Sequence, residues 1–385
     1  MVGNVRLSSS STTPVMPRVT HLITSLAIGG AENAAIRLAG NLQKRGSSNQ
    51  IVSILPFPQY AREFTVPAFS LGVRRAWDLP KAMHRLSRIV GEHRSTVLCT
   101  WLYHADLVGG LMRVTCRNKI SVTWNLRTSE PKGQRLGSSR FIRPLCAKFS
   151  RWLPDHIVGN SEAVVRTHVG LGYCKSKIQC VPNGYDLTRF SSDLAKRQAV
   201  RASLGIHQNE KLVGMVARWH PAKDHATFLA AVAKARMAHP EIRVFLAGSG
   251  VIAENEDLQR LIKENGLASN VLQLGLRADV ESLLNAADVM CLFSNAEEGF
   301  PNAVAESMAC ERCCVASDTG GTAEVLGDCG VLVPRSDPVA AGAALCGMLE
   351  LPQAERDRIG RKARLRVMEK FSLDTVTDRY LALWQ

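Results

Sequence analysis

At 385 residues the chain is too long for one typical hydrophobic core and fits two domains of about 150–200 residues each. A hydrophobic content of 46% with 21% charged residues is typical of a globular protein. No run of 18 apolar residues occurs, and residues 1–17 lack the apolar stretch of a signal peptide. These features exclude a transmembrane helix and predict a cytoplasmic protein whose residues 1–17 form a disordered lead-in.

Positive charge is concentrated in the first half of the chain. Residues 1–182 hold 25 Lys and Arg against 8 Asp and Glu, whereas residues 183–385 hold 23 against 26. This asymmetry indicates an acidic partner for the first half: nucleic acid, an anionic membrane surface or an anionic substrate. No aromatic stacking motif or recognised nucleic-acid module accompanies the charge, so a nucleic-acid binder is an alternative that rests on charge alone.

Eleven cysteines are scattered along the sequence, which favours reduced thiols over a disulfide framework. Cys310, Cys313 and Cys314 form a cluster, but no second Cys or His pair lies nearby to complete a zinc site. We therefore expect buried thiols there and no bound metal.

Short apolar runs alternate with helical patterns from end to end, which is typical of β-α units built around parallel sheets. Strands are expected at 19–26, 50–55, 95–101, 119–126 and 155–160, then at 211–217, 242–248, 270–275, 288–294, 313–317 and 330–333. The turn-rich segment 181–193 separates the two sets. The expected domains are therefore 18–182 and 183–365, followed by a closing helix at 366–385. Two such doubly wound domains would bind ligands at the carboxyl ends of their strands, in the crevice between them.

Several polar or glycine-rich turns follow strands of the first half. Gly29 and Gly30 precede a helical pattern, so the backbone there could approach an anionic ligand closely. The spacing is not G-x-G-x-x-G, which disfavours dinucleotide binding. His104, just past a strand, could touch the transferred group or move protons, or it could be structural. Asn125 and Arg127 end the next strand and would face the crevice.

The strand expected at 211–217 runs into RWHPAKDHATFL. Arg218 and Lys223 flank a tight loop, and Asp224 is a good N-cap for a helix expected at 225–238. A guanidinium, an ammonium and a helix amino end together suit a diphosphate. Two solvated surface cations are the alternative, which the position at the end of a strand disfavours.

The segment AEEGFPNAVAESMA, residues 296–309, places two carboxylates around a helix start. The helix is expected to begin at Asn302, after Pro301. Glu306 would then lie one turn in, on the face of Asn302, with Glu298 on the preceding loop beside unpaired N–H groups. Carboxylates and N–H groups in one crevice suit a ligand rich in hydroxyls, such as a sugar joined to a ribose. A glutamate-rich surface turn is the alternative.

Residues 137–155 have bulky apolar side chains at near-helical spacing with cations between them. The apolar residues are Phe141, Leu145, Phe149 and Trp152, and the cations are Arg140, Arg143, Lys148 and Arg151. The pattern fits a helix on an anionic bilayer, or equally a helix that packs its apolar stripe into the core. Pro144 is expected to limit the helix to starting about there.

Three motifs in order, GGAE, R-x4-K and E-G-F-P-N-x3-E, resemble the retaining glycosyltransferases of family 4. VGNSEAV, VPNGYDLTRF and the closing FSLDTVTDRYLALW are also similar, so the resemblance covers essentially residues 18–385. It implies the GT-B fold, an α/β architecture in which two Rossmann-like domains face each other across a cleft and the C-terminal helix crosses back to the N-terminal domain. It also implies a nucleotide-diphosphate sugar as donor substrate, with no cofactor or bound metal.

Carried over by position, the resemblance implies that Arg218 and Lys223 hold the donor diphosphate and that Glu306 holds the ribose hydroxyls. It implies further that Glu298 binds the transferred sugar, together with backbone groups of Gly299, Phe300 and Asn302. The Gly29–Gly30 loop would close on the phosphates. Arg218 and Lys223 would then stabilise the leaving diphosphate, and Glu298 is expected to position the sugar rather than attack it.

The sequence departs from the family pattern at two places. Glu311 and Cys313 stand where the family often has Gly and Pro. The family's histidine after the strand that ends at WNLR is also absent, and Asn125 or Arg127 occupies that neighbourhood.

The resulting prediction is a metal-independent, retaining enzyme of the hexosyltransferase type, peripheral on the inner face of the cell membrane. It would move a sugar to a lipid-linked or polysaccharide acceptor in cell-envelope glycan synthesis, such as that of lipopolysaccharide. The alternatives are a nucleotide-sugar epimerase of the same fold, a non-catalytic sugar-nucleotide sensor and a basic nucleic-acid binder.

Overall fold

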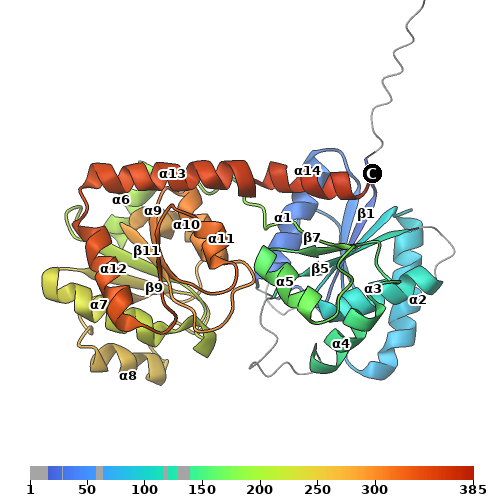
Figure 1. Ribbon diagram of the computed structural model, residues 1–385, viewed down its shortest axis with the longest axis horizontal. Coiled ribbons are helices and arrows are strands. Elements are labelled where there is room, and N and C mark those ends of the chain that lie inside the picture. The colour runs from blue at the N-terminus through green and yellow to red at the C-terminus, as the bar shows by residue number, and fades with distance from the viewer. Residues whose placement is uncertain (1–15, 28, 58–63, 116–119, 129–138) are drawn as a thin grey trace, which may run out of the picture.

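A computed structural model of the chain describes residues 16–27, 29–57, 64–115, 120–128 and 139–385. These residues form two α/β domains that lie side by side, and the last two helices run along one side of both (Figure 1). The lead-in expected over residues 1–17 falls almost wholly outside the described residues.

The N-terminal domain contains a parallel sheet of seven strands in the order β3-β2-β1-β4-β5-β6-β7. The strands are β1 (Val19–Ile23), β2 (Asn49–Ser53), β3 (Ala68–Ser70), β4 (Val97–Trp101), β5 (Ser121–Leu126), β6 (His156–Gly159) and β7 (Ile178–Cys180). The helices are α1 (Gly30–Lys44), η1 (Ala76–Asp78), α2 (Leu79–Glu92), α3 (Tyr103–Thr115), α4 (Ser139–Phe149) and α5 (Glu162–Gly170).

The C-terminal domain contains a parallel sheet of six strands in the order β10-β9-β8-β11-β12-β13. The strands are β8 (Leu212–Val216), β9 (Arg243–Ala247), β10 (Val271–Gln273), β11 (Val289–Leu292), β12 (Cys313–Ser317) and β13 (Val331–Val333). The helices are α6 (Leu194–Ser203), η2 (Pro221–Lys223), α7 (His225–Ala238), α8 (Glu256–Glu264), α9 (Val280–Ala286), α10 (Asn302–Ala309), α11 (Thr322–Leu326), α12 (Pro338–Glu350) and α13 (Gln353–Phe371). The last helix of the chain is α14 (Leu373–Leu383).

The strand order reverses once in each sheet, between β1 and β4 and between β8 and β11. At the first reversal Val19 pairs with Val97, and at the second Val289 pairs with Val213. The connections on either side of a reversal leave in opposite directions, so the carboxyl ends of the two central strands border a crevice. The loops after β1, β8 and β11 carry Gly29, Arg218 and Glu298, respectively, and the helix that follows β4 carries His104.

All eleven strands expected from the sequence are present, and two further strands, β3 and β7, were missed. Each of these has only three residues and lies at one edge of the N-terminal sheet. None of their residues is fully buried, so they lack the continuous apolar run that marks the central strands.

The two C-terminal helices join the domains, as the resemblance implied. The chain leaves α13 beside the interdomain linker, which is the segment 181–193 between β7 and α6. There the N–H of Tyr185 donates to the carbonyl of Phe371, and the N–H of Leu373 donates to the carbonyl of Tyr185. α14 then buries Val376 and Tyr380 in the core of the N-terminal domain. This domain is therefore built from two segments that are far apart in the sequence.

Two local expectations have different outcomes. Cys310 at the end of α10 and Cys313 and Cys314 at the start of β12 are buried free thiols, as predicted. The limit set by Pro144 is wrong, because the residue lies inside α4, which is helical from Ser139. Pro144 is exposed, so the backbone hydrogen bond that its ring removes is lost on the solvent side of the helix.

Candidate active site

The loop after β8 carries the two predicted diphosphate ligands. It forms the short helix η2, which ends at Lys223, and Asp224 then adopts a left-handed conformation with φ of 37°. The Asp224 carboxylate accepts a hydrogen bond from the N–H of Thr227 and caps α7, as predicted. Arg218 is exposed, whereas Lys223 is half-buried.

The loop after β11 is bound to this turn. The N–H of Asn295 donates to the carbonyl of Ala222, and the side-chain amide of Asn295 donates to the carbonyl of Pro221 at 2.9 Å. Lys223 forms an ion pair with Glu298, and the Ser294 hydroxyl donates to the same carboxylate oxygen at 2.5 Å. The loops thus bring Lys223 and Glu298 together, and they hold the Glu298 carboxylate in one orientation.

Two glycines allow other backbone segments to pack directly against the loop that carries Glu298. A Cβ on Gly320, whose φ is 53°, would lie 2.1 Å from the carbonyl oxygen of Glu298. A Cβ on Gly299 would lie 2.6 Å from the carbonyl oxygen of Arg127, at the end of β5 in the other domain. Only glycine fits either position without displacing backbone, so the loop is fixed by its neighbours in both domains.

Two helix amino ends meet at the interface between the domains. A Cβ on Gly30, the first residue of α1, would lie 2.9 Å from the side-chain nitrogen of Asn302, the first residue of α10. The first N–H groups of a helix have no partner inside the helix, and the helix dipole makes this end positive. Positive potential from two helices, one in each domain, therefore converges where Gly30 and Asn302 meet.

Glu306 lies one turn inside α10, as predicted. Its carboxylate is mostly buried and forms an ion pair with Arg37 of α1 at 3.3 Å. Burial raises the pKa of Glu306, and the Arg37 charge opposes this shift. The sequence did not indicate Arg37, because nothing local distinguishes it from any other cation on a helix.

Asn302 and Phe300 contact the linker through their side chains. The side-chain oxygen of Asn302 accepts hydrogen bonds from Asn183 at 3.0 Å and from the Tyr185 hydroxyl at 2.6 Å. Phe300 is buried and stacks on the Tyr185 ring. A role for these residues toward a sugar therefore depends on their backbone groups, which is the role predicted for them.

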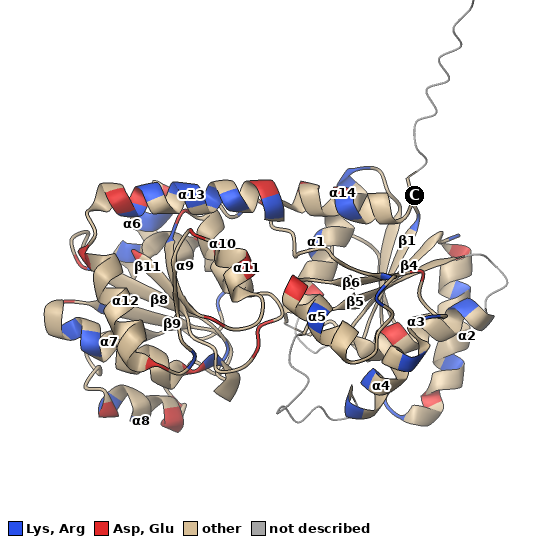
Figure 2. Ribbon diagram, in the orientation of Figure 1, with Lys and Arg blue, Asp and Glu red and all other residues tan. Residues whose placement is uncertain are grey.

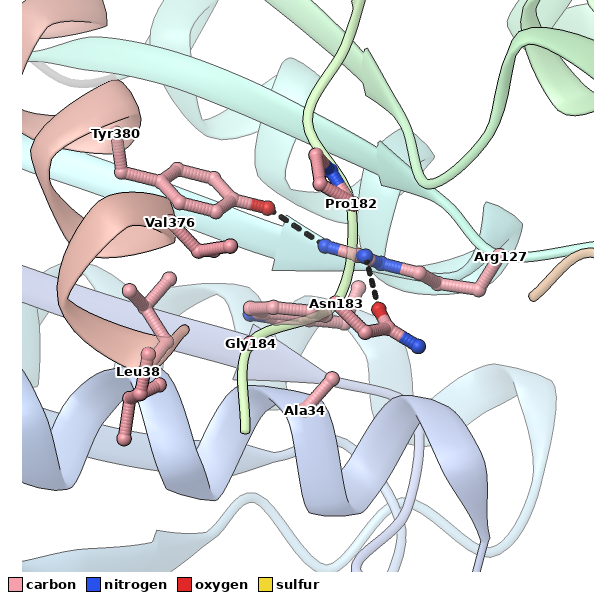
Figure 3. Close-up of a pocket in the computed structure, with 10 residues that line it drawn as sticks. Ala34, Leu38, Arg127, Pro182, Asn183, Gly184, Val376 and Tyr380 are labelled. Atoms are coloured by element: carbon pink, nitrogen blue, oxygen red, sulfur yellow. Dashed lines mark hydrogen bonds between the residues drawn. The ribbon is translucent and has the colours of Figure 1, made fainter. Parts of the chain in front are cut away.

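Arg127 forms hydrogen bonds with Asn183 of the linker and with Tyr380 of α14 (Figure 3), and it also bonds Asn125. Asn125 is fully buried and donates to the carbonyl of Thr100. Arg127 donates to Asn125, to Asn183 at 2.7 Å and to the hydroxyl of Tyr380 at 2.6 Å. The structure thus shows both side chains bonded to protein groups, and contact with a substrate stays a prediction for each.

His104 lies in the first turn of α3, just past the carboxyl end of β4. It is half-buried, and this burial lowers its pKa. A role of His104 toward a substrate stays a prediction.

Two absences concern only the part of the chain that the structure describes. None of its helices is both long enough and apolar enough to cross a membrane. No three of its His, Cys, Asp or Glu side chains gather as a group that could hold a metal ion.

Comparisons with known proteins match this architecture. Solved structures with the same fold include Anabaena HepE in complex with UDP and glucose, with a TM-score of 0.82 and 20% identity over 95% of this chain and 98% of that one. WaaG, a glycosyltransferase involved in lipopolysaccharide biosynthesis, gives a TM-score of 0.71 at 15% identity over 95% of this chain and 99% of WaaG. At these identities the likeness shows the GT-B fold.

Sequence relatives include the D-inositol 3-phosphate glycosyltransferases of Segniliparus rotundus and Mycobacterium tuberculosis. Each is 30% identical to this chain, over 239 and 240 residues respectively. The match covers 60% of this chain in both cases, but only 52% and 48% of the relatives. The chain thus matches about half the length of each relative.

Two family models together span most of the chain. Residues 28–189 match "Glycosyltransferase Family 4", and residues 210–350 match "Glycosyl transferases group 1". The two matches fall on the N-terminal and C-terminal domains in the order that the GT-B fold requires. The chain therefore belongs to the group 1, family 4 glycosyltransferases.

Proposed function

We propose that this protein is a retaining, metal-independent glycosyltransferase that moves a hexose from a nucleotide-diphosphate sugar to an acceptor. The observation that carries the proposal is the meeting of the amino ends of α1 and α10, together with the pairing of Lys223 with Glu298 on the loop that precedes α10. Helix amino ends and an ammonium suit the charge of a diphosphate bound between the domains. Family membership supports the same reaction class.

The proposed mechanism follows from the charge that develops during transfer. Cleavage of the bond between sugar and diphosphate leaves positive charge on the sugar and negative charge on the diphosphate. Arg218 and Lys223 stabilise the leaving diphosphate, which is the largest kind of contribution in such catalysis. Glu298 accepts hydrogen bonds from sugar hydroxyls, and its fixed orientation by Ser294 and Lys223 suits that positioning role. A covalent sugar adduct on Glu298 would contradict this assignment.

Other predicted residues complete the proposed site. Glu306 holds the ribose hydroxyls, and the backbone of Gly299, Phe300 and Asn302 holds hydroxyls of the sugar. The loop at Gly29 closes on the phosphates. On the acceptor side His104, Asn125 and Arg127 contact the substrate, and Arg127 also ties the end of β5 to the linker.

We further propose that the donor carries uridine diphosphate and that the acceptor is a lipid-linked or polysaccharide glycan of the cell envelope. Anabaena HepE has been solved with UDP-glucose, and WaaG acts in lipopolysaccharide biosynthesis. The net charge of +17 in residues 1–182 supports an anionic acceptor or membrane surface. Such an enzyme works in the cytoplasm, on the inner face of the cell membrane.

The donor site is tested by the melting temperature in the presence of nucleoside diphosphates and their sugars. A ligand that binds only the folded protein raises the melting temperature. At a free ligand concentration of 100 times Kd it stabilises the folded state by about 2.7 kcal/mol. We expect a shift with UDP that is lost in Lys223→Ala and retained in Lys263→Ala, which removes an exposed cation of the same domain. No shift with any nucleotide would remove the main support for the proposal. Conversion of the sugar nucleotide without an acceptor would identify an epimerase instead.

A further inference from the structure

The helix α4 directs large apolar side chains toward solvent. Phe141 is 67% exposed, Leu145 44% and Phe149 36%, and Trp152, just after the helix, is 64% exposed. The spacing of these residues, by four, four and three positions, places them on one face. The side of α4 that packs on the domain carries Cys146 and Ala147, which are buried. Of the two alternatives left open by the sequence, the packed stripe is thus excluded.

Cations border this face, and no acid interrupts it. Residues 139–152 contain four Lys or Arg and no Asp or Glu. Arg140, Lys148 and Arg151 are exposed, and the Arg140 guanidinium lies 5.1 Å from the centre of the Phe141 ring. Basic residues mark α4 in Figure 2 as well. Lys177 adds a further positive charge, since its ammonium donates to the carbonyl of Arg151 at 2.7 Å.

We infer that this surface is the site at which the protein docks on an anionic lipid bilayer. We call it the α4 face; it consists of Phe141, Leu145, Phe149 and Trp152 with Arg140, Lys148 and Arg151. Trp, Phe and Leu enter the boundary between headgroups and acyl chains, while Lys and Arg bind anionic headgroups. The same surface on a second copy of the chain would bring like charges together, so charge complementarity favours the bilayer over self-association.

The position of α4 relates the bilayer to the proposed active site. α4 is the next described element after β5, and the end of β5 reaches Gly299 in the other domain. It lies on the side of the N-terminal domain opposite to α14 (Figure 1). This inference rests on the proposed function in one respect: docking there would bring a lipid-linked acceptor toward the crevice from the membrane.

The test is flotation of the full chain with vesicles of phosphatidylcholine, alone or mixed with phosphatidylglycerol. We expect the protein to float with the mixed vesicles at low salt and to be released at high salt. Phe141→Ser with Trp152→Ser removes the apolar anchors, and Arg140→Glu with Arg151→Glu reverses two charges. Each pair should lower vesicle binding by at least about 10-fold. Each basic residue raises the affinity for an anionic surface about fivefold, and binding also scales with the apolar area that enters the bilayer.

The controls keep the inference separate from folding and from donor binding. Leu194→Ser with Met237→Ser changes two apolar side chains of the C-terminal domain that are at least as exposed, and it should leave vesicle binding unchanged. All variants should retain the melting shift with UDP, which reports the donor site alone. The inference is overturned if the wild type binds neither vesicle, or if both pairs of substitutions leave binding intact. A concentration-dependent dimer that Phe141→Ser with Trp152→Ser abolishes, without vesicle binding, would assign the face to a second copy instead.

Discussion

Arg37 of α1 and Glu306 of α10 form an ion pair that joins the two domains, with Nη1 3.3 Å from Oε1. The Arg37 guanidinium also lies over the ring of Tyr185 in the linker, 4.5 Å from its centre. The carboxylate proposed to hold the ribose is therefore already paired with the opposite domain, through an arginine that also packs on the linker. We therefore expect donor binding at Glu306 to depend on the relative position of the domains.

Replacing Arg37 by Met should destabilise the protein by about 1–3 kcal/mol at neutral pH, since it leaves the Glu306 charge buried and unpaired. Burial already raises the pKa of Glu306, and loss of Arg37 raises it further. The folded state then holds a proton that the unfolded state has released, so the destabilisation fades as the pH falls toward the unfolded value near 4. Denaturant unfolding at several pH values measures this. An equal cost of Arg37→Met in the Glu306→Gln background would show that the two residues are not coupled.

Glu324 of α11 forms a second bridge between the domains. Its carboxylate accepts hydrogen bonds from the N–H groups of Glu162 and Ala163, the first residues of α5, at 2.7 and 2.8 Å. Glu324→Ala should cost about 1 kcal/mol and shift the chain toward more open arrangements, with a larger radius of gyration in X-ray scattering. Glu355→Ala, which removes an exposed ion pair within α13, is the control. Identical scattering of Glu324→Ala and the control would contradict a closing role for Glu324.

Gly320 determines the position of the Glu298 loop. Gly320→Ala places a methyl group against the Glu298 carbonyl, at a φ that L side chains rarely adopt, so we expect a loss of about 1–3 kcal/mol. Because Glu298 would be displaced, transfer activity should fall by about 100-fold. Gly347→Ala lies in an exposed part of α12 with open space around it, and should be neutral or stabilising by up to about 1 kcal/mol. Equal activity of the two variants would refute this role of Gly320.

Three buried histidines predict acid sensitivity. Burial lowers the pKa of His21, His168 and His225 to about 4 in each case. Unfolded histidines titrate near 6.5, so between about pH 6.5 and 4 the unfolded chain binds more protons than the folded one, and stability falls as the pH falls. His168→Gln should reduce the slope of the unfolding free energy by up to about 1.4 kcal/mol per pH unit. His84→Gln, at an exposed position of α2, is the matched control, and the prediction fails if the two slopes agree.

Sequence patterns predicted an element correctly wherever its own residues carried the apolar run or the start position typical of that element. The central strands are buried on both faces and read as apolar runs, and the start of α10 follows Pro301 as expected. The fold, the family and the crossing of the last helix are confirmed. The edge strands β3 and β7 carried no such signal, and neither did the course of α4 through Pro144.

The site was predictable only in part, for a related reason. The end of a strand pointed to Lys223 and the start of a helix to Glu298, and the strand-end rule applied after β11 would have added Ser294. Arg37 and Glu324 could not be predicted, because their partners are 269 and more than 160 residues away in the sequence, respectively. The contacts of Arg127 could not be predicted either, because its partners come from the linker and from α14, which are distant in the sequence.

The return of α14 to the first domain has a consequence for synthesis. Val376 and Tyr380 complete a core whose other members, such as Leu38 and Trp101, are made more than 270 residues earlier. Domains commonly fold one after another as the chain emerges from the ribosome, the first one first. Here the N-terminal domain cannot complete its core until residues 376–380 have been translated, and until then part of the apolar surface of its sheet stays exposed. The second domain, with its own separate core, can fold before the first is finished.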